Sequence, residues 1–248
     1  MLAIHDGTPG LKILAYPLPN SMRSDTMQGL AVVFADDCSI LAVLDARTLT
    51  ALRTASVTAL GARHLAPKTV RRIGIVGFGL QGRAHLDVLS RMYPEAIVSV
   101  HARRAAALEH YLGAHPELGD VVLAKSGLDA SYQADILVTT NTTTVPVVQA
   151  DWVHPGMLFC QIGRDEECTR DAVMRFDRLV ANDREQTLKE AHKSLAKTYL
   201  ADRSMRVVTE LRDVLEGRRP GRLTADESIM LSCTGLSVVD VATARFIA

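Results

Sequence analysis

Three glycines in the stretch GIVGFGLQGRAH have the spacing of a dinucleotide-binding loop. Gly77 ends an apolar run and allows a tight turn, Gly79 lets the backbone approach a phosphate, and Gly82 allows close packing where a helix begins. The N-terminus of that helix would present N–H groups and a partial positive charge to a pyrophosphate. This context favours a cofactor loop, with Leu80 and Gln81 among its contacts, over an ordinary strand-to-helix turn.

The residues after the next strand bear on which dinucleotide binds. An NAD site usually places a carboxylate there to bind the ribose 2′-hydroxyl. Here no carboxylate occurs between Glu95 and Glu109, and the stretch HARR ends in Arg103 and Arg104. Because guanidiniums bind phosphate through paired, charge-assisted hydrogen bonds, we expect NADP, with NAD as the alternative. The simpler interpretation of both arginines is that they face water at the start of a helix.

Three charged residues occupy apolar or ligand-binding positions. Arg53 lies on the apolar stripe of a predicted helix, Lys12 lies within the strand LKILAY, and Asp165 follows the strand MLFCQIG at its carboxyl end. A buried charge needs a partner unless its side chain reaches solvent, and open α/β sheets bind ligands at the carboxyl ends of their strands. We therefore expect the three to meet at one cleft. The cations would bind a substrate carboxylate, and Asp165 would exchange a proton with an amine or water near a nicotinamide.

Hydrophobic periodicity predicts an α/β fold. Short strands broken by turns are followed by a helix that Pro67 stops, and from Arg72 onward apolar runs alternate with helical segments, including REQTLKEAHKSLAK and MRVVTELRDVLEG. This alternation is typical of a doubly wound (Rossmann) parallel sheet. We expect a Rossmann dinucleotide-binding domain at residues 67–222, and a small, shortened α+β substrate and dimerisation domain formed by residues 1–66 and 223–248.

Composition limits the class of partner. The 28 basic residues balance 28 acidic ones, so no net field would hold the chain to nucleic acid or an anionic membrane, and we expect a small-molecule partner. No apolar run is long enough to span a membrane, and the first residues do not resemble a signal peptide. Four scattered cysteines and eight histidines without metal-binding spacing suggest neither a disulfide framework nor a metal site. These features predict a cytoplasmic protein.

Several ordered motifs resemble the ornithine cyclodeaminase and mu-crystallin family almost from end to end. They are LDARTLTALRTASVTAL, IVGFGLQGRAH, PGMLFCQIGRD, DREQTLKEA and CTGLSVVDVA. The family contains cyclodeaminases, alanine dehydrogenases, ketimine reductases and synthases that join amino acids to keto acids. All perform hydride chemistry at the α-carbon of an amino or imino acid with a nicotinamide cofactor.

The resemblance implies roles for particular residues. Lys12 is similar to the lysine that binds and polarises the substrate carboxylate, Arg53 to the arginine that binds it, and Asp165 to the acid/base. Further positions are similar to cofactor contacts of the family or lie beside them: Thr54, Thr139, Thr140, Asn141, Ile162 and Gly163. The resemblance also implies a homodimer.

The sequence also departs from the family pattern. About 50 to 60 N-terminal residues that supply strands and a second carboxylate-binding arginine are expected to be absent, judged by family domain lengths. Arg23 is a candidate for the missing arginine. A lysine that often follows the acid by four residues is replaced by Thr169. These departures leave the substrate open.

The leading hypothesis is an NAD(P)-dependent amino-acid or imino-acid oxidoreductase or cyclodeaminase. The alternative is a non-catalytic NAD(P)H-binding protein with an incomplete substrate site. Shortening favours the alternative, whereas the retention of Lys12, Arg53 and Asp165 together favours the enzyme.

Overall fold

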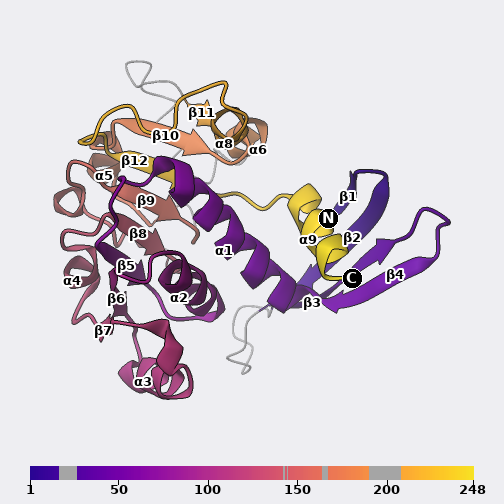
Figure 1. Ribbon diagram of the computed structural model, residues 1–248, viewed down its shortest axis with the longest axis horizontal. Coiled ribbons are helices and arrows are strands. Elements are labelled where there is room, and N and C mark those ends of the chain that lie inside the picture. The colour runs from indigo at the N-terminus through magenta and orange to yellow at the C-terminus, as the bar shows by residue number, and fades with distance from the viewer. Residues whose placement is uncertain (17–26, 142, 144, 164–166, 190–207) are drawn as a thin grey trace. The chain divides into compact units, whose positions relative to one another are not determined.

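A computed structural model describes residues 1–16, 27–141, 143, 145–163, 167–189 and 208–248 (Figure 1). The chain forms two compact units. Unit 1 consists of Met1–Thr54 and Gly235–Ala248, and unit 2 consists of Ala55–Thr234. Helix α1 (Ala46–Leu65) is continuous across the boundary between them. Among the described residues, no helix combines the length and hydropathy that a membrane crossing requires.

Unit 1 is a four-stranded antiparallel sheet with helix α9 (Ser237–Ile247) packed on one face. Its strands follow chain order: β1 (Leu2–His5), β2 (Thr8–Ala15), β3 (Gln28–Phe34) and β4 (Ile40–Asp45). Side chains alternate along each strand, so Ala31 and Val33 point towards α9 and pack with Val241 and Ala244. Gly10 permits this approach, because a Cβ there would lie 2.8 Å from a methyl carbon of Val241.

Unit 2 is built on an eight-stranded parallel sheet in the order β11-β10-β12-β9-β8-β5-β6-β7. The strands are β5 (Arg72–Val76), β6 (Ile97–His101), β7 (Val121–Leu123), β8 (Ile136–Thr139), β9 (Leu158–Gln161), β10 (Arg178–Ala181), β11 (Thr209–Glu210) and β12 (Ile229–Ser232). From β5 the chain proceeds to β6 and β7 on one side and then returns to β8 on the other. Such a reversal creates a ligand-binding crevice at the carboxyl ends of the two central strands.

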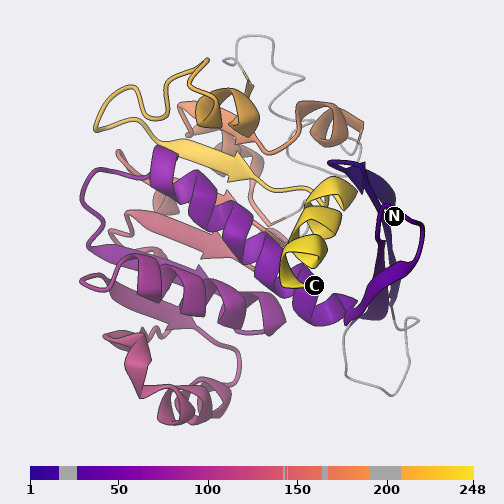
Figure 2. The same cartoon turned by 45° about the vertical axis from the view of Figure 1, so that its right-hand side comes forward.

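Helices cover both faces of this parallel sheet (Figure 2). The helical segments of unit 2 that follow α1 are α2 (Leu80–Met92), α3 (Ala105–Ala114), η1 (Pro116–Leu118), α4 (Gly127–Ser131), η2 (Ala150–Trp152), α5 (Arg170–Met174), α6 (Arg184–Lys189) and α8 (Leu211–Leu215). The part of α1 in unit 2 packs with α2 and α3 in one apolar cluster, whereas α4, η2 and α5 contribute to the cluster on the other face. Buried Val, Ile and Leu on both sides account for the apolar character of the strands.

The predicted fold class is confirmed: a doubly wound parallel sheet is joined to a small α+β region. Helix α1 ends at Leu65, two residues before Pro67 as expected. One helix prediction was too long, because Thr209 and Glu210 of the segment MRVVTELRDVLEG form a strand beside β10, and the helix covers only Leu211–Leu215. The predicted helix REQTLKEAHKSLAK begins as α6, and the part of this segment after Lys189 lies outside the described residues.

Candidate functional site

The glycine loop has the conformation that its sequence predicts. Gly77 follows β5 directly and has a φ of +108°, which residues with a Cβ rarely adopt, and a Cβ there would lie 2.8 Å from the hydroxyl oxygen of Thr140. A Cβ on Gly82 would lie 2.1 Å from the carbonyl oxygen of Gly77, so the first turn of α2 packs directly on the loop. The loop is also tied to β8, because the Thr140 hydroxyl donates to the Gly77 carbonyl at 3.1 Å.

Gly79 differs from the other two glycines because the space around it is open. A Cβ built there meets no described heavy atom within 4 Å, and Gly79 is the N-cap of α2 without a side-chain cap. Leu80 and Gln81, directly after it, are both half-buried. The first N–H groups of a helix have no carbonyl partner within that helix, so they are available to an anion. The open space at Gly79 and the N–H groups at the start of α2 form a cradle that fits the pyrophosphate of a dinucleotide.

Helix α2 is held in place by His85, which has no exposed surface. Its Nδ1 lies 2.7 Å from the carbonyl oxygen of Gln81, and its Nε2 lies 2.9 Å from the hydroxyl of Thr58 on α1. Burial lowers the pKa of His85 to about 4, opposed by the Gln81 carbonyl, which favours the charged form. His85 is therefore a neutral residue that fixes the helix behind the glycine loop.

A buried carboxylate organises the segment that follows β8. Glu167 has no exposed surface, and its oxygens accept hydrogen bonds from the Thr139 hydroxyl at 2.6 Å and the Asn141 backbone N–H at 2.9 Å. Gly163 lies against it, since a Cβ there would lie 2.1 Å from a Glu167 oxygen. Ile162 and Gly163 both donate backbone hydrogen bonds to the Thr139 carbonyl. The structure thus brings the predicted cofactor contacts Thr139–Asn141 and Ile162–Gly163 together.

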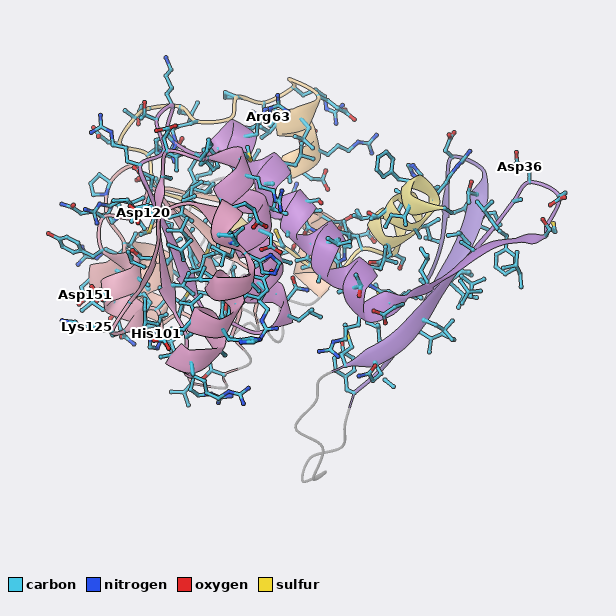
Figure 3. The ribbon with its side chains drawn as sticks, turned by 60° about the horizontal axis from the view of Figure 1, so that its bottom comes forward. Asp36, Arg63, His101, Asp120, Lys125 and Asp151 are labelled. Atoms are coloured by element: carbon cyan, nitrogen blue, oxygen red, sulfur yellow. The ribbon has the colours of Figure 1, made fainter. Side chains whose placement is uncertain are left out.

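The two candidate 2′-phosphate ligands lie after β6. Arg103 and Arg104 are both exposed, Arg104 is the N-cap residue of α3, and neither forms an ion pair with a described residue. His101, labelled in Figure 3, ends β6, and its Nδ1 lies 3.4 Å from the carbonyl oxygen of Ala124. The strand end therefore carries exposed positive charge beside the glycine loop, whose Gly77 N–H donates to the His101 carbonyl.

In unit 1, Lys12 and Arg53 come together around a carboxylate. Lys12 Nζ lies 2.6 Å from one oxygen of Asp240 on α9, and Arg53 Nε lies 3.0 Å from the other. All three side chains are more than nine-tenths buried. The contacts are at ion-pair distance, although the Asp240 oxygens lack hydrogen-bond alignment with their partners. Lys12 also donates to the hydroxyl of Thr50 at 3.2 Å, and that hydroxyl donates to the Ala46 carbonyl.

The cluster contains two cations and one anion, so it retains one positive charge. Burial lowers the pKa of Lys12 and Arg53 lowers it further, whereas Asp240 raises it. Among the described residues, no partner is found for the terminal nitrogens of Arg53. Such a fork can bind a carboxylate with two parallel hydrogen bonds. Thr54, next along α1, is buried, and its hydroxyl donates to the Thr50 carbonyl.

Asp165 and Arg23 lie outside the described residues. Sequence analysis missed Asp240, although it lies in SVVDVA, where an acid among apolar helix residues is the same signal that identified Arg53. It also missed Glu167, whose surroundings carry no such signal, and the pairing of Thr58 with His85. The described residues contain no cluster of three metal-ligating side chains.

Comparison with known proteins extends this picture. The profile of the ornithine cyclodeaminase/mu-crystallin family matches residues 11–248. The alanine dehydrogenase of Archaeoglobus fulgidus is 27% identical over 97% of this chain and 76% of its own length. The mouse ketimine reductase mu-crystallin is 28% identical over 84% of this chain and 64% of its own length. The solved structure of an archaeal alanine dehydrogenase dimer with bound NAD is 26% identical, with a TM-score of 0.82 over 100% of this chain and 78% of that one.

These matches cover 84–100% of this chain but only 64–78% of each relative. The resemblance seen in the ordered motifs is confirmed by the family profile. The chain belongs to the ornithine cyclodeaminase/mu-crystallin family.

Proposed function

We propose that this chain is an NAD(P)-dependent enzyme that acts at the α-carbon of an amino acid or its imino acid. It would work as a reductase or dehydrogenase, or as a redox-neutral cyclodeaminase. The observation that carries the proposal is the buried cluster of Lys12, Arg53 and Asp240, whose excess positive charge suits a substrate carboxylate. The open cradle at Gly79 supports the cofactor, and relatives named alanine dehydrogenase and ketimine reductase support the substrate class.

Each part of the proposed site has a separate task. A bound nicotinamide supplies or accepts the hydride. Lys12 and Arg53 bind and orient the substrate carboxylate, which converts binding energy into correct placement of the α-carbon. Asp165, which lies outside the described residues, exchanges a proton with the substrate amine or with water. Glu167 positions the Thr139–Asn141 segment and Gly163 for contact with the cofactor.

NADP is the proposed cofactor, with NAD as the alternative. Arg103 and Arg104 are exposed at the end of β6, where a dinucleotide presents its adenosine ribose. Because no described carboxylate pairs with them, their guanidiniums are available for a 2′-phosphate.

A homodimer is proposed through the face of the unit 1 sheet opposite α9. The strand registers place Leu2, Ile4, Ile13, Leu30 and Val43 on that face, and all five are exposed. A contiguous apolar surface of this kind marks an interface. A second copy is the proposed occupant because the archaeal relative with a TM-score of 0.82 is a dimer.

Cofactor binding and turnover test the activity in sequence. Fluorescence titrations with NADPH and NADH come first, followed by a screen of cyclic imino acids, of keto acids with amines, and of ornithine. Consumption of reduced cofactor would identify a reductase, and ammonia release without net cofactor change a cyclodeaminase. Cofactor binding without turnover over the whole panel would contradict the enzyme and favour a binding protein.

Substitution of Asp165 identifies the proton-transferring group. We expect Asp165→Asn to lower turnover by at least about a hundredfold while cofactor affinity is unchanged. Asp171→Asn, at an exposed acid in the first turn of α5, is the control for loss of one negative charge nearby in sequence. Equal turnover in Asp165→Asn and the wild type would remove Asp165 from the mechanism.

A further inference from the structure

Asp240 is the one buried carboxylate in the described part of unit 1, and the proposed mechanism gives it no task. It comes from α9, whereas the groups it contacts come from β2 and α1. Its two oxygens are divided between them, one facing Lys12 Nζ and the other facing Arg53 Nε. Asp240 is therefore the group that brings the two cations to one point.

The charge of the cluster differs from that of an ordinary structural ion pair. One cation and one anion would neutralise each other, but here two buried cations share one anion. A buried charge without a counter-ion is costly. A cluster that retains one positive charge is suited to a ligand that brings one negative charge.

The directions of the contacts support the same conclusion. Asp240 meets Arg53 through Nε, which leaves the terminal nitrogens of that guanidinium without a described partner. Lys12 has three N–H donors, and the described residues engage two of them, through Asp240 and Thr50. Both cations therefore keep N–H groups that can donate hydrogen bonds to a second carboxylate.

On the basis of the proposed function, we propose that Asp240 is a positioning residue: its carboxylate holds the Lys12 ammonium and the Arg53 guanidinium side by side, so that the pair presents one net positive charge to a single substrate carboxylate. Asp240 acts through Lys12 and Arg53 and does not itself contact the substrate. Without it, two like charges would face each other in a buried site, and Lys12 is the one that can lose its proton.

Asp240→Asn is the variant that tests this role, because it keeps the side-chain shape and removes the charge. The probe is pyrrole-2-carboxylate, a planar analogue of a cyclic imino acid, titrated in the presence of NADPH. In the variant, burial and Arg53 lower the pKa of Lys12 with no opposing carboxylate. We expect affinity to fall by up to tenfold per pH unit above the new pKa, at pH values where wild-type affinity is constant.

Other charged groups on the elements around Lys12 must be excluded as the source of that pH dependence. They are His5 and the amino group of Met1 on or beside β1, Asp45 at the end of β4, Arg47, Arg63 and His64 on α1, and Arg245 on α9. The double variant Lys12→Met, Asp240→Asn removes the proposed titrating group. We expect its weak binding to be independent of pH, and a retained pH dependence would overturn the proposal.

Matched controls separate this effect from loss of folding. Asp36→Asn removes one carboxylate from the exposed turn between β3 and β4, labelled in Figure 3, and should behave as the wild type. NADPH affinity should be unchanged in every variant, because the glycine loop belongs to unit 2. Asp240→Asn with wild-type affinity at all pH values would show that Asp240 does not position the pair.

A ligand-free measurement distinguishes failure of this inference from failure of the proposed function. NMR of the lysine Cε groups, with the Lys12 signal assigned through Lys12→Met, follows the titration of Lys12 directly. We expect Lys12 to titrate at lower pH in Asp240→Asn than in the wild type, and titration at the same pH would overturn the inference. If the wild-type protein binds NADPH but not pyrrole-2-carboxylate, the substrate class fails, and the Lys12 titration still decides whether Asp240 controls Lys12.

Discussion

His85 lies within α2 with both ring nitrogens engaged and no exposed surface. Its pKa in the folded protein is lowered from 6.5 to about 4. Between these values the folded state therefore binds fewer protons than the unfolded state. The stability that neutral His85 contributes is fully present above pH 6.5 and is lost as the pH falls towards 4. From pH 7 to pH 5 this group alone should lower the free energy of unfolding by about 2 kcal/mol.

Urea unfolding of His85→Gln at the two pH values measures this contribution. The variant should be less stable than the wild type at neutral pH, because it loses the hydrogen bond to Gln81, but it should lose about 2 kcal/mol less on acidification. His110→Gln, at an exposed histidine on α3, should follow the wild type. If His85→Gln and the wild type lose the same free energy of unfolding on acidification, His85 is not the neutral buried group described here.

The arginines after β6 provide a prediction of cofactor preference. Arg103→Asp replaces a group that attracts a 2′-phosphate with one that repels it and can accept a hydrogen bond from a 2′-hydroxyl. We expect NADPH affinity to fall at least about tenfold while NADH affinity is retained or increased. Arg63→Asp, on the exposed side of α1 (Figure 3), controls for the change in net charge. Unchanged NADPH affinity in Arg103→Asp would defeat the NADP assignment.

Individual residues were predictable from sequence where they broke an apolar pattern. Lys12 inside a strand and Arg53 on a helix stripe both had to find a partner, and the structure shows one for each. Sequence could not identify Asp240 as that partner, because it lies far along the chain and no local rule links α9 to β2. The role of Glu167 was equally hidden, since its contacts depend on how the segments after β8 and β9 meet.

We expect two glycines of the loop to have different roles: Gly82 is needed for folding, and Gly79 is needed for cofactor binding. Gly82 has no room for a Cβ, which would lie 2.1 Å from the Gly77 carbonyl oxygen, whereas Gly79 has open space. Gly82→Ala should therefore lower stability by about 1–3 kcal/mol, because the loop and α2 must separate. Gly79→Ala should leave the thermal midpoint of the cofactor-free protein nearly unchanged and still weaken NADPH binding, because its methyl group would occupy the approach of the pyrophosphate.

Thermal unfolding without cofactor and NADPH titration of both variants test this pair, each serving as the control for the other. Normal NADPH affinity in a folded Gly79→Ala protein would show that the pyrophosphate does not approach this loop.

At the level of elements, the sequence predicted the long features well: α1, the β5–α2 unit and the parallel strands all carry strong periodicity. It missed β1 and β11, which are too short for a periodic signal and exist because neighbouring strands pair with them.

The apolar face of the unit 1 sheet leads to a prediction about assembly. Val43 lies on that face and is 60% exposed. Val43→Asp would place a charge within the proposed interface and should convert a dimer into a monomer, because burial of an unpaired carboxylate opposes association. Sedimentation velocity measures the change. Val122→Asp, at an exposed valine on the edge strand β7 of unit 2, should leave assembly unaltered. A wild-type monomer, or a dimeric Val43→Asp protein, would contradict the proposed interface.

The order of segments along the chain has a consequence for biosynthesis. Unit 1 is completed by α9, which follows the entire Ala55–Thr234 unit in the sequence. During translation, the face of β1–β4 that α9 covers therefore stays uncovered while the dinucleotide unit is synthesised. Lys12 and Arg53 lack Asp240 throughout that interval. The cluster of Lys12, Arg53 and Asp240 can thus assemble only after the Ala55–Thr234 unit has been translated, and a message truncated before the codon for Asp240 would yield a dinucleotide unit without it.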